Sequence, residues 1–162
     1  MHSLRFDLDR FQAAQDYGGA FATALAELRA GRKRGHWIWF VFPQLRGLGT
    51  SAMAERYGIE GGAEAEVYLR HPVLRLRLRE ATWAVRGQLT SNSPDLRRLM
   101  GSEIDVLKLV SSMTLFEQIA RRVRALEPLP ELSELEVMAG EILAIADGQG
   151  YPRCRFTLDA LR

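Results

Sequence analysis

Apolar residues recur at steps of three and four along the segment 111–126, and this spacing constrains the fold more than any other feature of the chain. The residues that form this stripe are Met113, Phe116, Ile119, Val123 and Leu126. They fall on one face of a helix with 3.6 residues per turn. The spacing therefore predicts a strong amphipathic helix that begins near Ser111 and packs one face against a core.

The segment 72–89 has a less obvious period. Leu and Arg alternate from Leu74 to Arg79, as they would in a half-buried strand. Pro72, however, suits the first turn of a helix, and the helical period continues for about four turns. The residues on that helical face are Leu74, Leu78, Ala81, Val85 and Leu89. Length therefore favours a helix over a strand.

No series of strand-like segments accompanies these helices, and glycines and prolines separate further helical stretches. The 162 residues, of which 47% are hydrophobic, suffice for one continuous core. We therefore predict an all-α fold, a compact orthogonal array of about six to eight helices in a single domain spanning residues 6–161.

Composition limits the possible functions. The net charge is +2 and acidic residues are interspersed among the basic ones, so the charge balance does not demand nucleic acid. The single cysteine, Cys154, excludes an internal disulfide, and three widely spaced histidines predict no metal site and no cofactor. No apolar run approaches the roughly 20 residues of a membrane span. We expect a cytoplasmic protein without a membrane partner, and the sequence indicates no oligomeric state.

A cluster of basic and aromatic residues occupies positions 31–44. The side chains there that suit phosphate binding and ring stacking are Arg32, Lys33, Arg34, Trp37, Trp39 and Gln44. The alternatives are structural. Three cations after a helix end complement its dipole, and a tryptophan is often a core anchor with one hydrogen-bonded edge. Because Trp37 and Trp39 are two positions apart, they cannot both face one pocket from regular structure.

A second group of polar residues precedes or enters the predicted helix. Its members are Asp105, Lys108, Ser111, Ser112 and Thr114. Free N–H groups and the dipole make a helix N-terminus a suitable anion site, so these residues are candidate ligand-binding groups. The alternative is that the serines only cap the helix and that Lys108 and Asp105 form a surface ion pair.

Together the two groups suggest a small enzyme or binding protein for a phosphorylated nucleoside or an ADP-ribose-like ligand. If the protein is an enzyme, His36 and Asp105 are the candidate catalytic residues of a metal-independent hydrolase that cleaves N-glycosidic or phosphate-linked bonds. One alternative is a nucleic-acid-binding module with a basic and aromatic surface that includes the arginines of segment 75–86. Another is a protein-interaction domain with Trp37, Trp39 and Phe42 exposed.

Several motifs of this chain resemble one known family. They are GRKRGHWIWFVFPQ at 31–44, GLGTS at 47–51, HPVL at 71–74 and DVLKLVSSMTLF at 105–116. The chain resembles the uncharacterised bacterial family called "domain of unknown function 1810" from Phe6 to Leu161. The resemblance implies a small helical domain and carries no established activity. The chain differs from the family pattern at Gly35, Arg75 and the segment 150–157.

Overall fold

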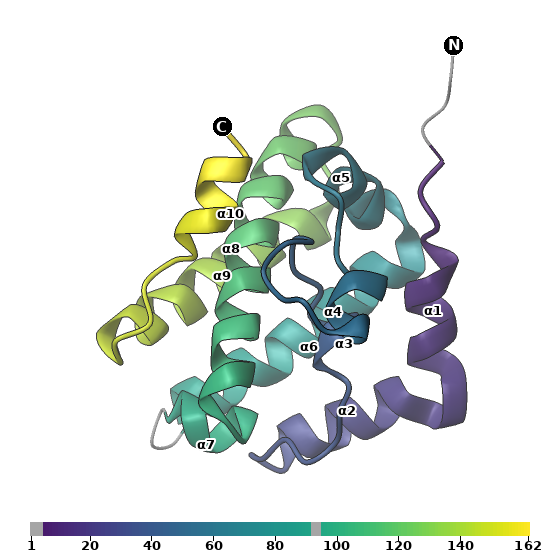
Figure 1. Cartoon of the computed structure of the whole chain (residues 1–162). Helices are drawn as coiled ribbons and strands as arrows, with labels where there is room; N and C mark the ends of the chain where they lie inside the picture. Colours follow the sequence, from purple (N-terminus) through teal and green to yellow (C-terminus); the bar gives the residue numbers. More distant parts are fainter. Residues whose placement is uncertain (1–4, 92–94) are drawn as a thin grey trace.

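The structure is a computed structural model that describes residues 5–91 and 95–162, and this part of the chain is helical (Figure 1). Its helices are α1 Asp9–Asp16, α2 Ala20–Arg29, α3 Ile38–Val41, α4 Ala52–Arg56, α5 Gly62–Arg70, α6 Pro72–Ser91, α7 Leu96–Met100, α8 Glu103–Leu126, α9 Pro130–Gly148 and α10 Arg155–Ala160. A 3-10 turn, Tyr17–Gly19, joins α1 to α2. Extended pairing within the described residues is confined to one isolated bridge between Leu45 and Ile59. The all-α prediction is confirmed, and six of these helices have eight or more residues.

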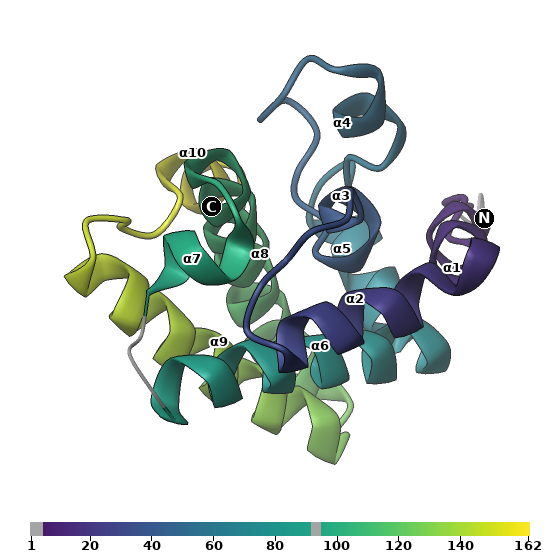
Figure 2. The same cartoon turned by 90° about the horizontal axis from the view of Figure 1, so that it is seen from below.

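Helix α8 lies at the centre of the molecule, with α10 on one side and α1 on the other (Figures 1 and 2). More than half of its 24 residues are buried, Phe116 and Ile119 completely. Its most extensive partner is α9, which also packs on α6. One hydrophobic core connects residues from Phe11 to Leu161. Burial of apolar side chains, at about 25 cal/mol per Å², is what holds these helices together.

The ambiguous segment after Pro72 is a single helix of 20 residues. Its predicted apolar face is buried throughout: Leu74, Leu78, Ala81, Val85 and Leu89. Of the alternating arginines, Arg77 pairs with Asp16 at 2.7 Å and Arg79 pairs with Glu134, whereas Arg75 is buried and donates to the Leu69 and Arg70 carbonyls. The helical interpretation of this segment was therefore correct.

The beginning of α8 differs from the prediction. The helix begins at Glu103, eight residues before Ser111, and the Ser102 hydroxyl caps it by accepting a hydrogen bond from the Asp105 N–H at 3.1 Å. Ser111 and Ser112 therefore lie in the helix interior and cannot act as caps. The anion site predicted at a helix N-terminus near these serines was wrong, because the backbone N–H groups there are already bonded within the helix.

The chain between α2 and α5 forms the irregular part that positions the candidate site. Helix α2 ends at Arg29, and the chain turns away at Gly31, whose φ of 85° lies in the left-handed region that glycine adopts without strain. The loop then contacts α7, since the Lys33 N–H donates to the Leu99 carbonyl at 2.7 Å. After α3, the segment that carries α4 projects from the body of helices (Figure 2).

Candidate functional site

The loop after α2 is organised around one carboxylate, that of Glu27. Its Oε1 accepts hydrogen bonds from the N–H groups of Arg34 and Gly35 and from Trp37 Nε1, all at 2.8 Å. Partial burial raises the pKa of Glu27. The three donors and the charge of Lys33 outweigh that effect, so the pKa lies below its ordinary value. Trp37 itself is 3% exposed, which identifies it as a core anchor with a hydrogen-bonded edge rather than a ligand platform.

Lys33 and Asp105 join the two groups of candidate residues. Their Nζ and Oδ2 atoms are 2.7 Å apart, and the side chains are 5% and 18% exposed. The Lys33 ammonium also donates to the Gly35 carbonyl and lies 5.0 Å from the centre of the Trp37 ring. The segments 31–44 and 105–114 therefore meet in space. The Lys33 ammonium holds these two segments together and is shielded from solvent.

Lys108 is the second cation beside Asp105. Its Nζ lies 3.9 Å from Asp105 Oδ1 and 5.2 Å from the centre of the Trp39 ring. Two lysines thus share one carboxylate, which leaves one positive charge in excess at this point. The Lys108 ammonium is the more weakly held of the two, because its distance to Asp105 exceeds that of a charge-assisted hydrogen bond.

A cavity of about 530 Å³ opens beside Lys108, between the loop 44–51, the first turns of α8 and the segment before α10. Gln44, Lys108 and Ser111 contribute polar groups to its wall, while Leu48, Ile104 and Leu107 supply apolar surface. A separate hollow of only about 10 Å³ has Gln44, Lys108 and Trp39 in its wall. The volume of the larger cavity lies within the range of about 300–1,000 Å³ that is typical of small-molecule sites.

Two polar side chains beside Lys108 make no hydrogen bond within the described residues. The indole Nε1 of Trp39 is buried without an acceptor. The side-chain amide of Gln44, a residue that is 8% exposed, has no partner in the same part of the chain. Ser111 differs, because its hydroxyl donates to the Leu107 carbonyl at 2.9 Å. Buried polar groups normally have partners, so both side chains are exceptions within the described part of the chain.

The other predicted site residues lie elsewhere. Arg32, Arg34 and His36 are exposed and do not line this cavity, and His36 makes no hydrogen bond or ion pair with Asp105. Ser112 is completely buried, with its hydroxyl unpaired within the described part of the chain. Thr114 is also buried, and its hydroxyl donates to the Val110 carbonyl at 2.7 Å. These five residues therefore do not converge with Lys108 on the cavity.

Sequence reasoning missed part of the cavity wall. The loop 47–51 contributes Leu48 to Ser51, and the segment before α10 contributes Pro152 and Cys154. The Cys154 N–H donates to the Thr114 hydroxyl at 3.1 Å, which fixes this segment against α8. The glycines at 47 and 49 marked a loop, but no local signal placed residue 154 beside residue 111.

The two alternative functions, protein interaction and nucleic-acid binding, require an exposed aromatic patch and a broad basic surface on α6 respectively. Trp37 and Phe42 are 3% and 0% exposed, so an exposed Trp–Trp–Phe patch is not present. Of the arginines on α6, Arg79 pairs with Glu134 and Arg86 pairs with Glu141. A broad basic surface on α6 is therefore largely neutralised.

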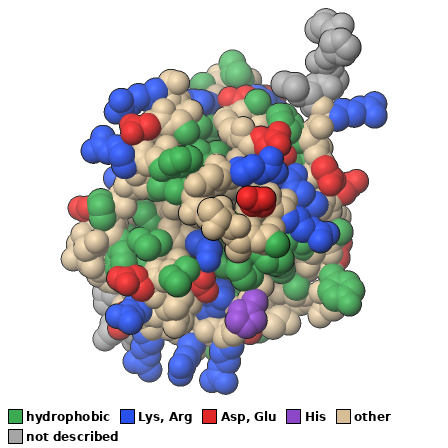
Figure 3. All heavy atoms as spheres, in the orientation of Figure 1, with side chains coloured by type: hydrophobic (Ala, Val, Ile, Leu, Met, Phe, Trp, Pro, Cys, Tyr) green, Lys and Arg blue, Asp and Glu red, His purple; other side chains and the backbone are tan. Residues whose placement is uncertain are grey.

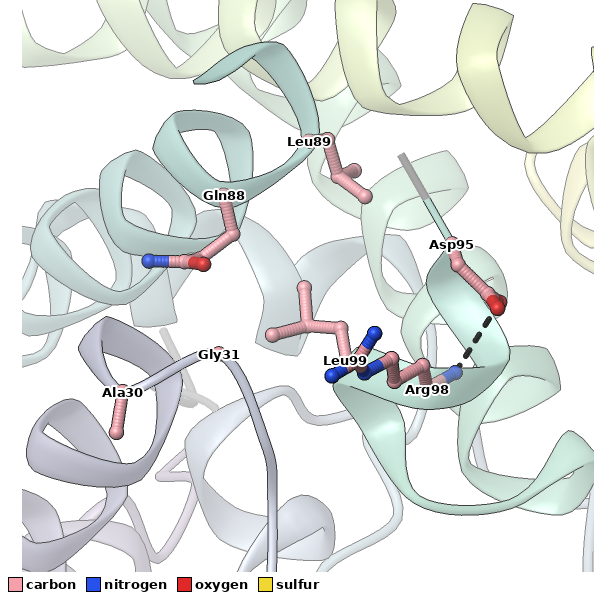
Figure 4. A pocket seen from close by; sticks show the side chains of 7 residues that line it. All are labelled: Ala30, Gly31, Gln88, Leu89, Asp95, Arg98 and Leu99. Carbon is pink, nitrogen blue, oxygen red and sulfur yellow. Dashed lines mark hydrogen bonds between the residues drawn. The ribbon is translucent and has the colours of Figure 1, made fainter. Parts of the chain in front are cut away.

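A second cavity, of about 440 Å³, lies between the end of α2, the last turns of α6 and α7 (Figure 4). Gln88, Asp95 and Arg98 supply its polar groups. Asp95 Oδ1 accepts a hydrogen bond from the Arg98 N–H at 3.2 Å and so caps α7. None of the predicted ligand-binding residues lines this cavity.

The described residues lack two further kinds of feature. Over 5–91 and 95–162, no cluster of three or more His, Cys, Asp or Glu side chains is placed to hold a metal ion. None of the helices described in these ranges is long and apolar enough to cross a membrane.

Comparison with known proteins places the chain in a family. Residues 5–129 match the family described as "Protein of unknown function (DUF1810)". No curated protein matches the chain. Among solved structures, the conserved hypothetical protein Rv1873 from Mycobacterium tuberculosis, a crystal structure at 1.38 Å, is 38% identical with a TM-score of 0.71, and the match covers 96% of both chains. The chain therefore belongs to the DUF1810 family.

Proposed function

We propose that the protein binds a small phosphorylated organic molecule, of which phosphorylated nucleosides are the first candidates, in the cavity beside Lys108. The observation that carries this proposal is the excess positive charge where Lys33 and Lys108 share Asp105 at the edge of a cavity of suitable volume. An anionic group of the ligand would pair with the Lys108 ammonium, which is the weakly held partner of that trio.

The remaining groups at the cavity support the same ligand class. The Gln44 side-chain amide lines the cavity and can donate a hydrogen bond to a ligand. Leu48, Ile104 and Leu107 provide an apolar wall for a ring or sugar face. Because the Lys108 ammonium lies against the Trp39 ring, we assign Trp39 to holding Lys108 rather than to stacking on the ligand.

The proposal concerns binding. His36 lies outside the cavity wall, and the Asp105 carboxylate is held by two lysines, so neither group is arranged as a free general base for a ligand at this position. Chromatography of the ligand recovered from the binding experiment described next would detect hydrolysis of its N-glycosidic or phosphate-linked bonds.

Calorimetric titration with adenosine monophosphate, ADP-ribose, inorganic phosphate and adenosine tests the proposal. We expect the phosphorylated nucleosides to bind and unphosphorylated adenosine not to bind. Lys108→Met keeps the aliphatic stem and removes the charge. It should weaken binding about 10- to 100-fold, the equivalent of one charge-assisted hydrogen bond of about 1.5–3 kcal/mol.

The matched control is Arg34→Met, which removes one exposed positive charge outside the cavity. Its affinity for the same ligand should equal that of the wild type. Equal losses in both variants would indicate a general charge effect and would contradict the site, as would the absence of binding by every phosphorylated compound.

A second readout uses the single cysteine of the chain, Cys154, which lines the cavity and is partly exposed. A ligand in the cavity should slow the alkylation of Cys154 by iodoacetamide, measured by mass spectrometry. Lys108→Met should remove this protection at a fixed ligand concentration. Unchanged alkylation at saturating ligand would place the ligand elsewhere.

A further inference from the structure

Four exposed arginines near the end of α2 and on α7 have no carboxylate partner within the described residues: Arg32, Arg34, Arg97 and Arg98. The basic side chains that project from the lower edge of the molecule in Figure 3 lie where Figure 1 places α7 and the end of α2. We call these four residues the arginine surface. The cavity beside Lys108 uses none of them.

The two segments that carry the arginine surface are fixed to each other. The Lys33 N–H donates to the Leu99 carbonyl at 2.7 Å. Lys33 lies between Arg32 and Arg34 in the sequence, and Leu99 directly follows Arg97 and Arg98. The Lys33 side chain points inward to Asp105, so only its neighbours Arg32 and Arg34 face solvent. Gly101 permits this approach, since a Cβ atom there would lie 3.0 Å from the Lys33 carbonyl oxygen.

The arginine surface differs in charge from the other arginine-rich region of the molecule. On α6, Arg77, Arg79 and Arg86 each pair with an aspartate or glutamate. At the arginine surface, Asp95 Oδ1 accepts from the Arg98 backbone N–H and Glu27 Oε1 accepts from three N–H donors, and within the described residues neither carboxylate forms an ion pair with a guanidinium group of this surface. Four guanidinium groups are therefore available to an external anion.

We propose that the arginine surface binds the phosphodiester backbone of a nucleic acid duplex without reading its sequence. Several guanidinium groups spread over two segments suit a repeating polyanion better than a single phosphate, and guanidinium binds phosphate in a bidentate manner. Trp37 is buried, so the neighbouring aromatic residue offers no base-stacking platform, which favours a duplex over a single strand.

The position of the apolar residues of α7 argues against binding of this surface to a lipid membrane. Leu96, Leu99 and Met100 are buried in the core, and the outward side of this five-residue helix carries Arg97 and Arg98. Helices that lie in a membrane surface bind through an apolar face that enters the lipid, with charge as an additional contribution. Helix α7 presents only charge.

Fluorescence anisotropy with a labelled DNA duplex of 20 base pairs, in sodium chloride from 50 to 200 mM, tests the proposal. Four phosphate contacts predict a slope of about −3.6 for log K against log[salt], or an affinity loss of about 100-fold over this range. Arg97→Gln/Arg98→Gln should halve the slope and reduce the loss to about 10-fold. Two duplexes of unrelated sequence should bind equally.

The matched control is Arg79→Gln/Arg86→Gln, which removes the same charge from α6 and should leave the slope unchanged. Lys108→Met should also retain duplex binding, so that failure of the cavity proposal and failure of this one can be told apart. The proposal is overturned by an absence of duplex binding at 50 mM salt, by equal losses in both double variants, or by arginine-dependent binding to phosphatidylglycerol vesicles without duplex binding.

Discussion

At the scale of single residues, Glu27 links the fold to the candidate site, because its carboxylate holds the backbone of the loop that carries Lys33. We expect Glu27→Gln to lower the free energy of unfolding at pH 7 by about 1–2 kcal/mol, since three charge-assisted hydrogen bonds become weaker bonds to a neutral amide. Urea denaturation followed by circular dichroism measures this change.

The effect of Glu27 should depend on pH. Its pKa in the folded protein is lowered, so its contribution to stability is fully present above about 4.5, the ordinary pKa of a glutamate, and is lost as the pH falls through the lowered value. The difference between wild type and Glu27→Gln should therefore shrink between pH 4.5 and pH 3. Glu80→Gln, which removes an exposed pair with Arg29, should change stability by less than about 0.5 kcal/mol throughout. A difference for Glu27→Gln that grows on acidification would contradict this assignment.

At the scale of elements, substitutions of two serines distinguish the observed start of α8 at Glu103 from the predicted start near Ser111. Ser102→Ala removes the cap and should destabilise the protein by about 1 kcal/mol. Ser112→Ala removes a buried hydroxyl without a partner in the described chain and should stabilise it by about 0.5–1 kcal/mol, because alanine also favours the helix interior. Thermal and urea denaturation of both variants measure these changes in the free energy of unfolding. Destabilisation by Ser112→Ala alone would support a helix that begins near residue 111.

The first turns of α8 were missed for a physical reason. In the segment 103–110, Ile104 and Leu107 are 65% and 52% exposed at the cavity, whereas Val106 and Leu109 are completely buried. Apolar residues on both sides of the helix hide the helical period that is clear after Ser111. Helix α6 was predictable because Leu74, Leu78, Ala81, Val85 and Leu89 form one continuous buried stripe at helical spacing, although Leu76 and Trp83 are exposed and Arg75 is buried.

The candidate site was predictable only in part. Lys33, Gln44, Lys108 and Asp105 were named from residue type, but their relation depends on contacts between segments about 70 positions apart, for which local spacing carries no information. Arg32 and Arg34 could not be distinguished from Lys33 either. Only the docking of the loop on Leu99 determines that Lys33 points inward and its neighbours outward.

At the scale of the whole molecule, the C-terminal segment closes the cavity from outside the 5–129 range that matches the family. Arg153 holds it to α8 through two hydrogen bonds to the buried carboxylate of Glu117, at 2.9 and 2.8 Å. The Thr114 hydroxyl and the Leu161 carbonyl provide further attachment, to the Cys154 N–H and the Arg122 guanidinium respectively. The wall of the cavity therefore depends on contacts between α8 and the C-terminal segment 153–161.

Arg153→Met tests this dependence. It leaves the Glu117 carboxylate buried without its cation and should lower the free energy of unfolding by about 2–3 kcal/mol. It should also speed the alkylation of Cys154, because the segment that holds this residue against α8 loses its attachment. Glu117→Leu/Arg153→Met, which removes both partners, should recover most of the stability. Arg162→Met breaks only an exposed pair with Asp159 and serves as the control. If Arg153→Met and Arg162→Met had equal effects, Arg153 would not hold the cavity wall in place.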